Sequence, residues 1–253
     1  MEFDFVRDPN CECAGFVDLS NPMNVMNDEV RTKGYYLFGN IHQNDSSKEC
    51  SCHRKYRFDK RYISKTKNSS LKPLDYVTTF EYVGDKSVYE KLLAIPAIVK
   101  NKKVENLIVQ VVGKSFSQKT SAVSKLAYNL IQDDQWVVYV DFNKILNDFL
   151  DNDFNDSNLR ECDWLIIDDC FMSEEVNFKN TVNKLLNIVT KRSKPTVIVS
   201  RKHIGEVKGN MYDPDLLQSI EARTQYYKTL LEFNDNYNNI KLKEQGAIDL
   251  WSM

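Results

Sequence analysis

Short apolar runs alternate with segments of helical periodicity from about residue 86 onward. The runs lie in NLIVQVVG, WVVYVDF, CDWLIIDD and PTVIVS, and each is nearly continuously apolar, as is typical of strands covered on both faces. Segments such as SAVSKLAYNLI and VNFKNTVNKLLNIVTKRS repeat apolar residues at i, i+3 and i+4 and predict amphipathic helices. This alternation predicts βαβ units, and therefore an α/β fold with a parallel sheet flanked by helices.

Three further helices are expected in this region. Residues 86–100 predict a helix that is interrupted or ended near Pro96, and NKILNDFL predicts a short one. In DPDLLQSIEARTQYY, Asp213 is the expected N-cap and Pro214 the first helical residue.

The first 75 residues differ from the rest of the chain. They hold four clustered cysteines and the segment SKTKNSSLKP, whose composition is typical of a loop or linker. A chain of 253 residues is long enough for one large domain or for a domain with a smaller partner. We therefore expect a small module over residues 1–75 and a second domain over residues 76–253.

Charge is nearly balanced overall but uneven along the chain. The 34 Lys plus Arg and 36 Asp plus Glu give a net charge of -2, which excludes a uniformly basic nucleic-acid coat. Between Lys48 and Lys72 there are nine basic and two acidic residues with Tyr and Phe between them. This stretch is either a contact for single-stranded DNA or a solvated helix face. No apolar run is long enough to span a bilayer, so we expect a soluble, cytoplasmic protein.

Four cysteines form two short pairs. Cys11 and Cys13, then Cys50 and Cys52, are a set of thiols that suits a tetrahedral Zn²⁺ site. The spacing C-x-C is tighter than the usual C-x₂₋₄-C, His42 and His53 are nearby substitutes, and the alternative is four reduced, unliganded thiols. Cys162 and Cys170 flank an apolar strand, and we expect them to be buried small hydrophobic residues.

The run GKSFSQKT follows the first predicted strand and opens a helix. A phosphate-binding loop has the pattern G-x-x-x-x-G-K-[ST], in which backbone N–H groups, the lysine and the hydroxyl hold phosphates and Mg²⁺. Gly113, Lys119 and Thr120 fit this spacing, but Gln118 stands in place of the second glycine, where the loop needs unusual backbone angles. The alternative is an ordinary strand-to-helix turn with a solvated lysine.

Two carboxylates end the third predicted strand. Asp168 and Asp169 follow four apolar residues, about 50 residues after the Lys-Thr pair. At this position in P-loop ATPases, one acid coordinates Mg²⁺ and the next can polarise the attacking water. Both would lie in the crevice outside the carboxyl ends of the strands, unless they belong only to a solvated turn.

This succession of motifs resembles the DnaC/DnaI-type helicase loaders, a branch of the AAA+ ATPases related to the IstB transposition ATPases. The resemblance covers roughly residues 86–233, from VQVVGKSFSQKTSAVSKLAYNLI through CDWLIIDDCF and KPTVIVSRKHI to DPDLLQSIEART. CECAGFV and ECSCHRK are similar to the zinc-binding leader of many phage-encoded members. The resemblance implies an AAA+ P-loop domain after a small zinc-binding, helicase-interacting domain.

It also implies a set of site residues. Lys119 and Thr120 would bind the phosphates of ATP or ADP, Thr120 and Asp168 would hold Mg²⁺, and Asp169 would act on the water. Arg223 would reach the nucleotide of a neighbouring subunit. The rest of the implied nucleotide site consists of Gly113, Ser117, Gln118, Ser121 and Arg201. Three features depart from the family pattern: Gln118, Arg201 in place of the sensor-1 Asn, and the lack of a sensor-2 arginine motif in FNDNYNNIKLKEQ.

Two functions from different classes follow from the resemblance. The first is an oligomeric loader that binds a hexameric replicative helicase and delivers it to single-stranded DNA. The second, indicated by Gln118 and Arg201, is a non-catalytic adaptor or inhibitor that occupies a helicase or loader surface. A transposition-type regulator is a third option, against which the zinc-like leader argues. A composition rich in Lys, Asn and Tyr, with this leader, favours a phage origin.

Overall fold

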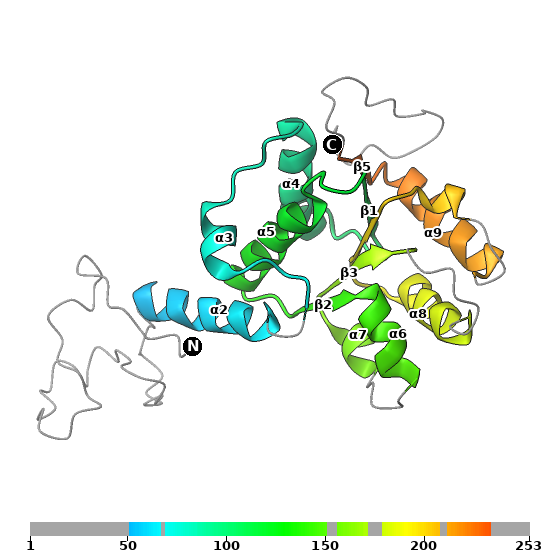
Figure 1. Ribbon diagram of the computed structural model, residues 1–253, viewed down its shortest axis with the longest axis horizontal. Coiled ribbons are helices and arrows are strands. Elements are labelled where there is room, and N and C mark those ends of the chain that lie inside the picture. Colours follow the sequence, from blue (N-terminus) through cyan, green and yellow to red (C-terminus); the bar gives the residue numbers. More distant parts are fainter. Residues whose placement is uncertain (1–50, 67–68, 151–155, 172–178, 208–211, 234–253) are drawn as a thin grey trace, which may run out of the picture. The chain divides into compact units, whose positions relative to one another are not determined.

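The structure is a computed structural model (Figure 1), and it describes residues 51–66, 69–150, 156–171, 179–207 and 212–233. The chain divides into two compact units, Met1–Ser64 and Lys65–Met253. In the first unit, all described residues belong to helix α2 (Ser51–Thr66). Within α2, the Lys55 Nζ donates to Asp59 Oδ2 at 2.6 Å, and the Lys60 ammonium lies 5.8 Å from the centroid of the Tyr56 ring.

The second unit contains a five-stranded parallel sheet with the order β2-β3-β4-β1-β5. The strands are β1 (Ile108–Val112), β2 (Val137–Asp141), β3 (Trp164–Cys170), β4 (Thr196–Ser200) and β5 (Leu230–Glu232). The helices are α3 (Leu74–Thr79), α4 (Lys86–Lys102), α5 (Lys119–Gln132), α6 (Phe142–Leu150), α7 (Ser157–Glu161), α8 (Lys179–Lys191) and α9 (Pro214–Tyr226), with the 3₁₀ turn η2 (Ile204–Glu206). The predicted parallel sheet is confirmed.

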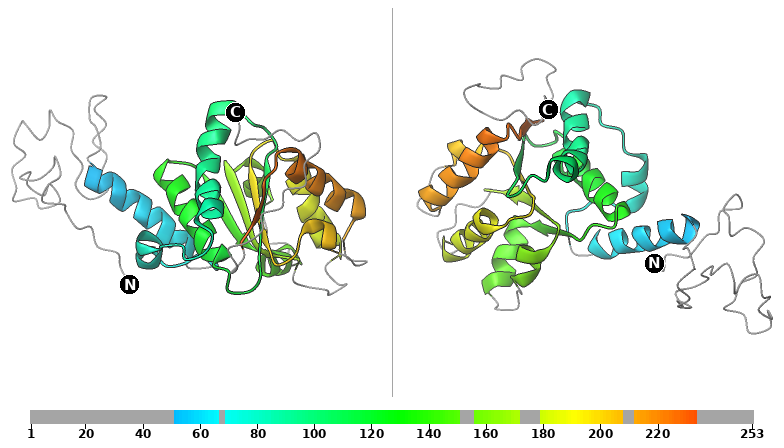
Figure 2. Two further views of the ribbon diagram at one scale, coloured as in Figure 1. Left: turned by 90° about the horizontal axis from the view of Figure 1, so that it is seen from above. Right: turned by 180° about the vertical axis from the view of Figure 1, so that it is seen from behind.

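Helices cover both faces of the sheet. Figure 2 shows α4 and α5 on one side of the strands and α8 and α9 on the other. On the second side, Leu165 and Ile167 of β3 belong to a buried cluster with residues of α6, α7, α8 and α9. Because side chains alternate along a strand, Ile166 and Asp168 lie on the opposite face, which α5 covers. The buried carboxylate of Asp168 therefore lies on the sheet face that α5 covers.

Two local predictions differ in outcome. At α9, the Asp213 carboxylate accepts the Asp215 N–H at 2.9 Å, and Pro214 is the first residue, so the predicted cap is confirmed. At α4, the prediction of an end or interruption near Pro96 is wrong, since the helix continues to Lys102. Burial of the preceding side chains Leu92 and Ile95 stabilises the helix in spite of the hydrogen bond that proline removes.

The short elements carried no usable sequence pattern. Strand β5 has three residues, and α3 and α7 have six and five, too few for a periodicity to be read. Strand β5 nevertheless completes the edge of the sheet beside β1, and its Leu231 is buried. None of the described helices is long and apolar enough to span a membrane.

Candidate nucleotide site

Loops that follow three different strands meet at the carboxyl edge of the sheet. Val112 at the end of β1 pairs with Ser200 of β4, and Cys170 at the end of β3 pairs with the same residue. The Gly113 N–H donates to the Ser200 carbonyl at 3.3 Å. The sheet therefore brings the predicted phosphate loop, the carboxylate pair and Arg201 to one edge.

Gly113 is required at its position because the chain passes very close to it. A Cβ atom there would lie 2.2 Å from the Phe233 carbonyl oxygen and 2.6 Å from Ser117 Oγ. Real Cβ atoms do not approach backbone so closely, and the Phe233 backbone is itself held by a hydrogen bond to Val112 O at 2.7 Å. The first glycine of the motif is thus explained by packing against the segment after β5.

The loop adopts left-handed backbone angles at two residues that are not glycine. Gln118 has φ 60° and Phe116 has φ 66°, a region that costs an L-residue roughly 1–2 kcal/mol. The expectation that position 118 needs unusual backbone angles is therefore confirmed, and a glutamine adopts them. The Gln118 side chain is hydrogen-bonded, since its Oε1 accepts the Val83 N–H at 3.2 Å.

Phe116 is a feature that the sequence reading missed. Its side chain is 97% exposed, although it sits at the tip of a loop where the backbone is strained. The motif allows any residue at this position. The only indication in the sequence is a bulky aromatic residue between two serines. Strain combined with exposure is a feature of functional loops.

Lys119 is turned back onto its own loop. It is buried, with 8% exposure, and its Nζ donates to Gly113 O at 2.7 Å, Lys114 O at 2.7 Å and Ser117 Oγ at 3.2 Å. The alternative of a solvated lysine is excluded by this geometry. The ammonium lies inside the loop, where backbone N–H groups at the start of α5 also favour an anion.

Asp168 is completely buried, and its carboxylate is held from both sides. Tyr139 OH and Ser70 Oγ donate to Oδ2, the latter at 3.5 Å, while the Asp169 N–H donates to Oδ1 at 2.9 Å. Burial, and then the negative charge of Asp168, raise the pKa of Tyr139 well above its usual value. The phenol therefore stays protonated and remains a donor.

Asp169 occupies an irregular point of β3. The register between β3 and β4 shifts between Ile167 and Cys170, and Asp169 has φ 54°. Burial raises the pKa of its carboxyl, and the charges of Asp168 and Asp141 raise it further, while Arg201 and Lys119 act in the opposite direction. This environment is suited to a group that handles protons.

Charge is divided along the carboxyl edge. Acids lie in the last residues of β2 and β3, at Asp141 and Asp168–Asp169, whereas basic residues lie after β4 and β1, at Arg201 and Lys119. Such an edge offers positive groups to phosphates beside oxygen ligands for a cation. Arg201 is exposed and close enough to influence Asp169.

The oxygen donors fit a nucleotide-borne Mg²⁺ better than a metal held by protein alone. The described residues contain no group of three His, Cys, Asp or Glu side chains that could hold a metal. Mg²⁺ in nucleotide sites usually takes one or two protein ligands and completes its shell with phosphates and water. Thr120 and Asp168 are donors of the right kind.

Ser121, the last of the residues predicted at the start of α5, forms a hydrogen bond with Tyr76 OH at 3.1 Å.

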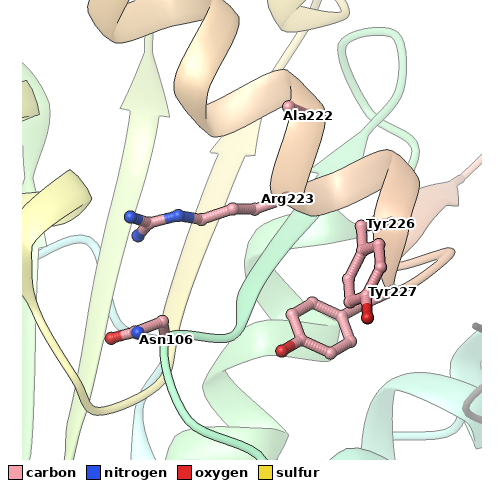
Figure 3. Close-up of a pocket in the computed structure, with 5 residues that line it drawn as sticks. All are labelled: Asn106, Ala222, Arg223, Tyr226 and Tyr227. Atoms are coloured by element: carbon pink, nitrogen blue, oxygen red, sulfur yellow. The ribbon is translucent and has the colours of Figure 1, made fainter.

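Arg223 lies at the amino ends of the strands, opposite the predicted phosphate loop. It lines a cavity of about 370 Å³ with Asn106, Ala222, Tyr226 and Tyr227, and Figure 3 shows its guanidinium extending from α9 toward Asn106. Asn106 precedes β1 while Gly113 follows it, a separation of roughly 17 Å for five strand residues. The structure therefore does not bring Arg223 together with the phosphate loop of its own chain.

The predicted zinc ligands mostly lie outside the described residues. Cys11, Cys13 and Cys50 belong to residues 1–50, and only the backbone of Cys52, in α2, is described. The zinc site stays a prediction. Cys162 and Cys170 are buried free thiols, as expected, and burial raises the pKa of both.

Comparison with known proteins defines the class of fold. Neither a family model nor a curated protein sequence matches the chain. Among solved structures, a DNA replication initiation factor has a TM-score of 0.50 and 16% identity, over 65% of this chain and 51% of that chain. AMPPCP-bound DnaA from Aquifex aeolicus gives the same values. The DnaC helicase loader has a TM-score of 0.44 and 15% identity, over 70% of this chain and 99% of that chain.

The parallel sheet and its flanking helices match the AAA+ P-loop fold, so the predicted fold class is confirmed for the sheet and its helices. This chain spans about half the length of the replication initiation factor and of the Aquifex DnaA. At this level of identity the likeness concerns the fold alone. The resemblance to AAA+ replication proteins that the motifs indicated is thus confirmed as a resemblance of folds.

Proposed function

We propose that this protein binds ATP or ADP with Mg²⁺ at the carboxyl edge of its sheet and uses the bound state to load a replicative helicase onto single-stranded DNA. The observation that carries the nucleotide site is the buried Lys119 ammonium inside the loop Gly113–Thr120, at the same edge as Asp168 and Asp169. The solved DnaA structure with this fold is bound to AMPPCP, an ATP analogue.

The proposed roles follow from the positions of the side chains. Lys119 exchanges its bonds to loop carbonyls for bonds to the phosphates, with Ser117 and Ser121 beside it. Thr120 and Asp168 hold Mg²⁺, which when bound neutralises charge on the phosphate oxygens. Asp169 orients the attacking water, and its raised pKa suits that role. Arg223 serves the nucleotide of another subunit, since it lies beside Asn106, at the opposite end of β1 from its own loop.

Helicase loading rests on the order of the modules and on the fold. A compact N-terminal unit precedes a domain whose fold is shared with a replication initiation factor. We propose that the N-terminal unit, with Zn²⁺ held by Cys11, Cys13, Cys50 and Cys52, binds the hexameric helicase, and that the AAA+ domains assemble as an oligomer.

The loading proposal is tested by co-purification of the full chain with a hexameric replicative helicase, with and without AMPPCP and Mg²⁺. We expect association that increases with nucleotide and a helicase that then binds single-stranded DNA faster. No association under either condition would exclude the loader function.

The second candidate is a non-catalytic adaptor that occupies a helicase or a helicase loader. It is favoured by Phe116 and Gln118, since two strained non-glycine residues stand where the backbone approaches phosphates. ATP turnover with and without single-stranded DNA separates the two candidates. If wild type and Lys119→Ala associate with the helicase equally and neither hydrolyses ATP, the adaptor replaces the loader.

A further inference from the structure

The carboxylate of Asp168 accepts hydrogen bonds from three parts of the chain. Tyr139 of β2 and Ser70 both donate to Oδ2, and the two hydroxyl groups are themselves 3.3 Å apart. The backbone of Asp169 donates to Oδ1. A carboxylate has about four lone-pair sites, so these bonds leave one position, on Oδ1, for a further partner.

Ser70 belongs to a segment that lies along the phosphate-loop helix. This segment, Ser69–Val77, is called the strap below. The Lys72 N–H donates to Ser124 Oγ at 3.1 Å, Tyr76 OH is 3.1 Å from Ser121 Oγ, and the Lys125 Nζ donates to Val77 O at 3.0 Å.

The strap is also anchored by apolar side chains. Leu71 is 5% exposed and Val77 is fully buried. Figure 1 shows α3, which contains the end of the strap, beside α5. The strap therefore spans from the first turns of α5 to the carboxylate of Asp168.

We infer that Tyr139 and Ser70 are positioning residues for Asp168, so that the strap takes part in building the metal site. The inference rests on the proposed binding of nucleotide with Mg²⁺. Tyr139 supplies the principal bond, which fixes the rotation of the carboxylate and directs its remaining lone pair. Ser70 makes a longer bond to the same oxygen, so the orientation of the carboxylate also depends on the strap.

The physical reason is the burial of the charge. A buried carboxylate is stable only if its oxygens are hydrogen-bonded, and a metal ligand binds well only when its orientation is fixed in advance. Partners that orient a metal ligand typically change metal affinity 10- to 100-fold when they are removed. Tyr139 contributes no atom to the phosphate loop, so its loss should affect the cation far more than the nucleotide.

The test is titration of the full chain with AMPPCP, once with Mg²⁺ and once with EDTA, for wild type, Tyr139→Phe, Ser70→Ala and the double variant. We expect Tyr139→Phe to weaken binding with Mg²⁺ about 10-fold and Ser70→Ala about 3-fold, with little change in EDTA. Because both hydroxyl groups serve one oxygen, the double variant should lose less than the product of the two effects. Tyr128→Phe, at another buried tyrosine, is the matched control and should behave as wild type.

Equal weakening in Mg²⁺ and EDTA would overturn the positioning role, since it would indicate a general loss of structure. Unchanged Mg²⁺-dependent binding in both single variants would also overturn it, while leaving the nucleotide site in place. Failure of wild type to bind AMPPCP at all would overturn the proposed function as well. Ser70 is only partly buried, so Ser70→Ala retains the fold and decides the matter if Tyr139→Phe does not fold.

Discussion

The loop Gly113–Thr120 and the carboxylate pair lie at the carboxyl ends of the strands, and they differ from the P-loop pattern in opposite ways. The loop departs in sequence, with Gln118 in a glycine position, yet its backbone has the left-handed angles of such a loop, and Lys119 points into it. The pair Asp168–Asp169 matches in sequence, yet Asp168 is fully buried beneath Tyr139 and Ser70.

This difference separates two requirements that a motif combines. Backbone shape depends on which conformations the flanking elements impose, and the structure imposes them here even on a glutamine and a phenylalanine, at a cost in strain. Access to a side chain depends on residues remote in sequence, such as Ser70. A motif match therefore predicts where a residue lies. Whether its side chain is accessible depends on neighbouring residues that the motif does not include.

Gly113→Ala should have the largest effect on the loop, because it places a side chain where the loop packs closely against backbone. The new Cβ would meet the Phe233 carbonyl oxygen at 2.2 Å, and backbone cannot move aside cheaply. We expect a loss of about 3 kcal/mol in the free energy of unfolding, measured by denaturant titration. Gly205→Ala is the control: its Cβ would meet the end of the flexible Glu221 side chain at 2.6 Å, so its stability should change by less than about 0.5 kcal/mol. Equal effects at the two glycines would contradict this account of the loop.

Phe116→Gly and Gln118→Gly measure the strain directly. At Phe116 glycine removes roughly 1–2 kcal/mol of left-handed strain and costs roughly 0.4–1 kcal/mol in unfolded-state entropy, with no buried ring to lose. We expect a gain of about 0.5 kcal/mol by the difference of these terms. Gln118→Gly also loses the bond to Val83 N–H, so its net change should be about zero. Destabilisation by Phe116→Gly would show that contacts of the Phe116 ring outweigh the strain in its backbone.

Asp169→Asn tests the carboxylate side of the comparison through the pH dependence of stability, and its effect should be much smaller than that of Gly113→Ala. The pKa of Asp169 is raised in the folded state, first by burial and then by Asp168 and Asp141. The folded state therefore binds the proton more tightly, and stability falls as pH rises from the unfolded pKa through the raised folded pKa. The variant should be more stable than wild type at pH 7 and equal to it at pH 3, in denaturant titrations at both values. Glu90→Gln, on an exposed face of α4, is the control, and a gain independent of pH would contradict the assignment.

The parts of the molecule that the sequence predicted are those with a local cause. Continuous apolar runs predicted β1 to β4, and Asp213 with Pro214 predicted the start of α9. The contact of Ser70 with Asp168 joins residues 98 positions apart, and no pattern within either segment indicates it. The left-handed angles of Phe116 and the continuation of α4 through Pro96 likewise result from tertiary packing that outweighs local preference.

The central claim is that the loop Gly113–Thr120 binds nucleotide through Lys119, and titration with AMPPCP and Mg²⁺ tests it most directly. Lys119→Ala removes the buried ammonium, whereas Lys114→Ala removes an exposed lysine of the same loop. We predict that wild type binds, that Lys119→Ala binds about 10- to 100-fold more weakly, as expected for the loss of charge-assisted hydrogen bonds, and that Lys114→Ala changes affinity less than about 3-fold. No binding by wild type, or equal binding by wild type and Lys119→Ala, would contradict the claim.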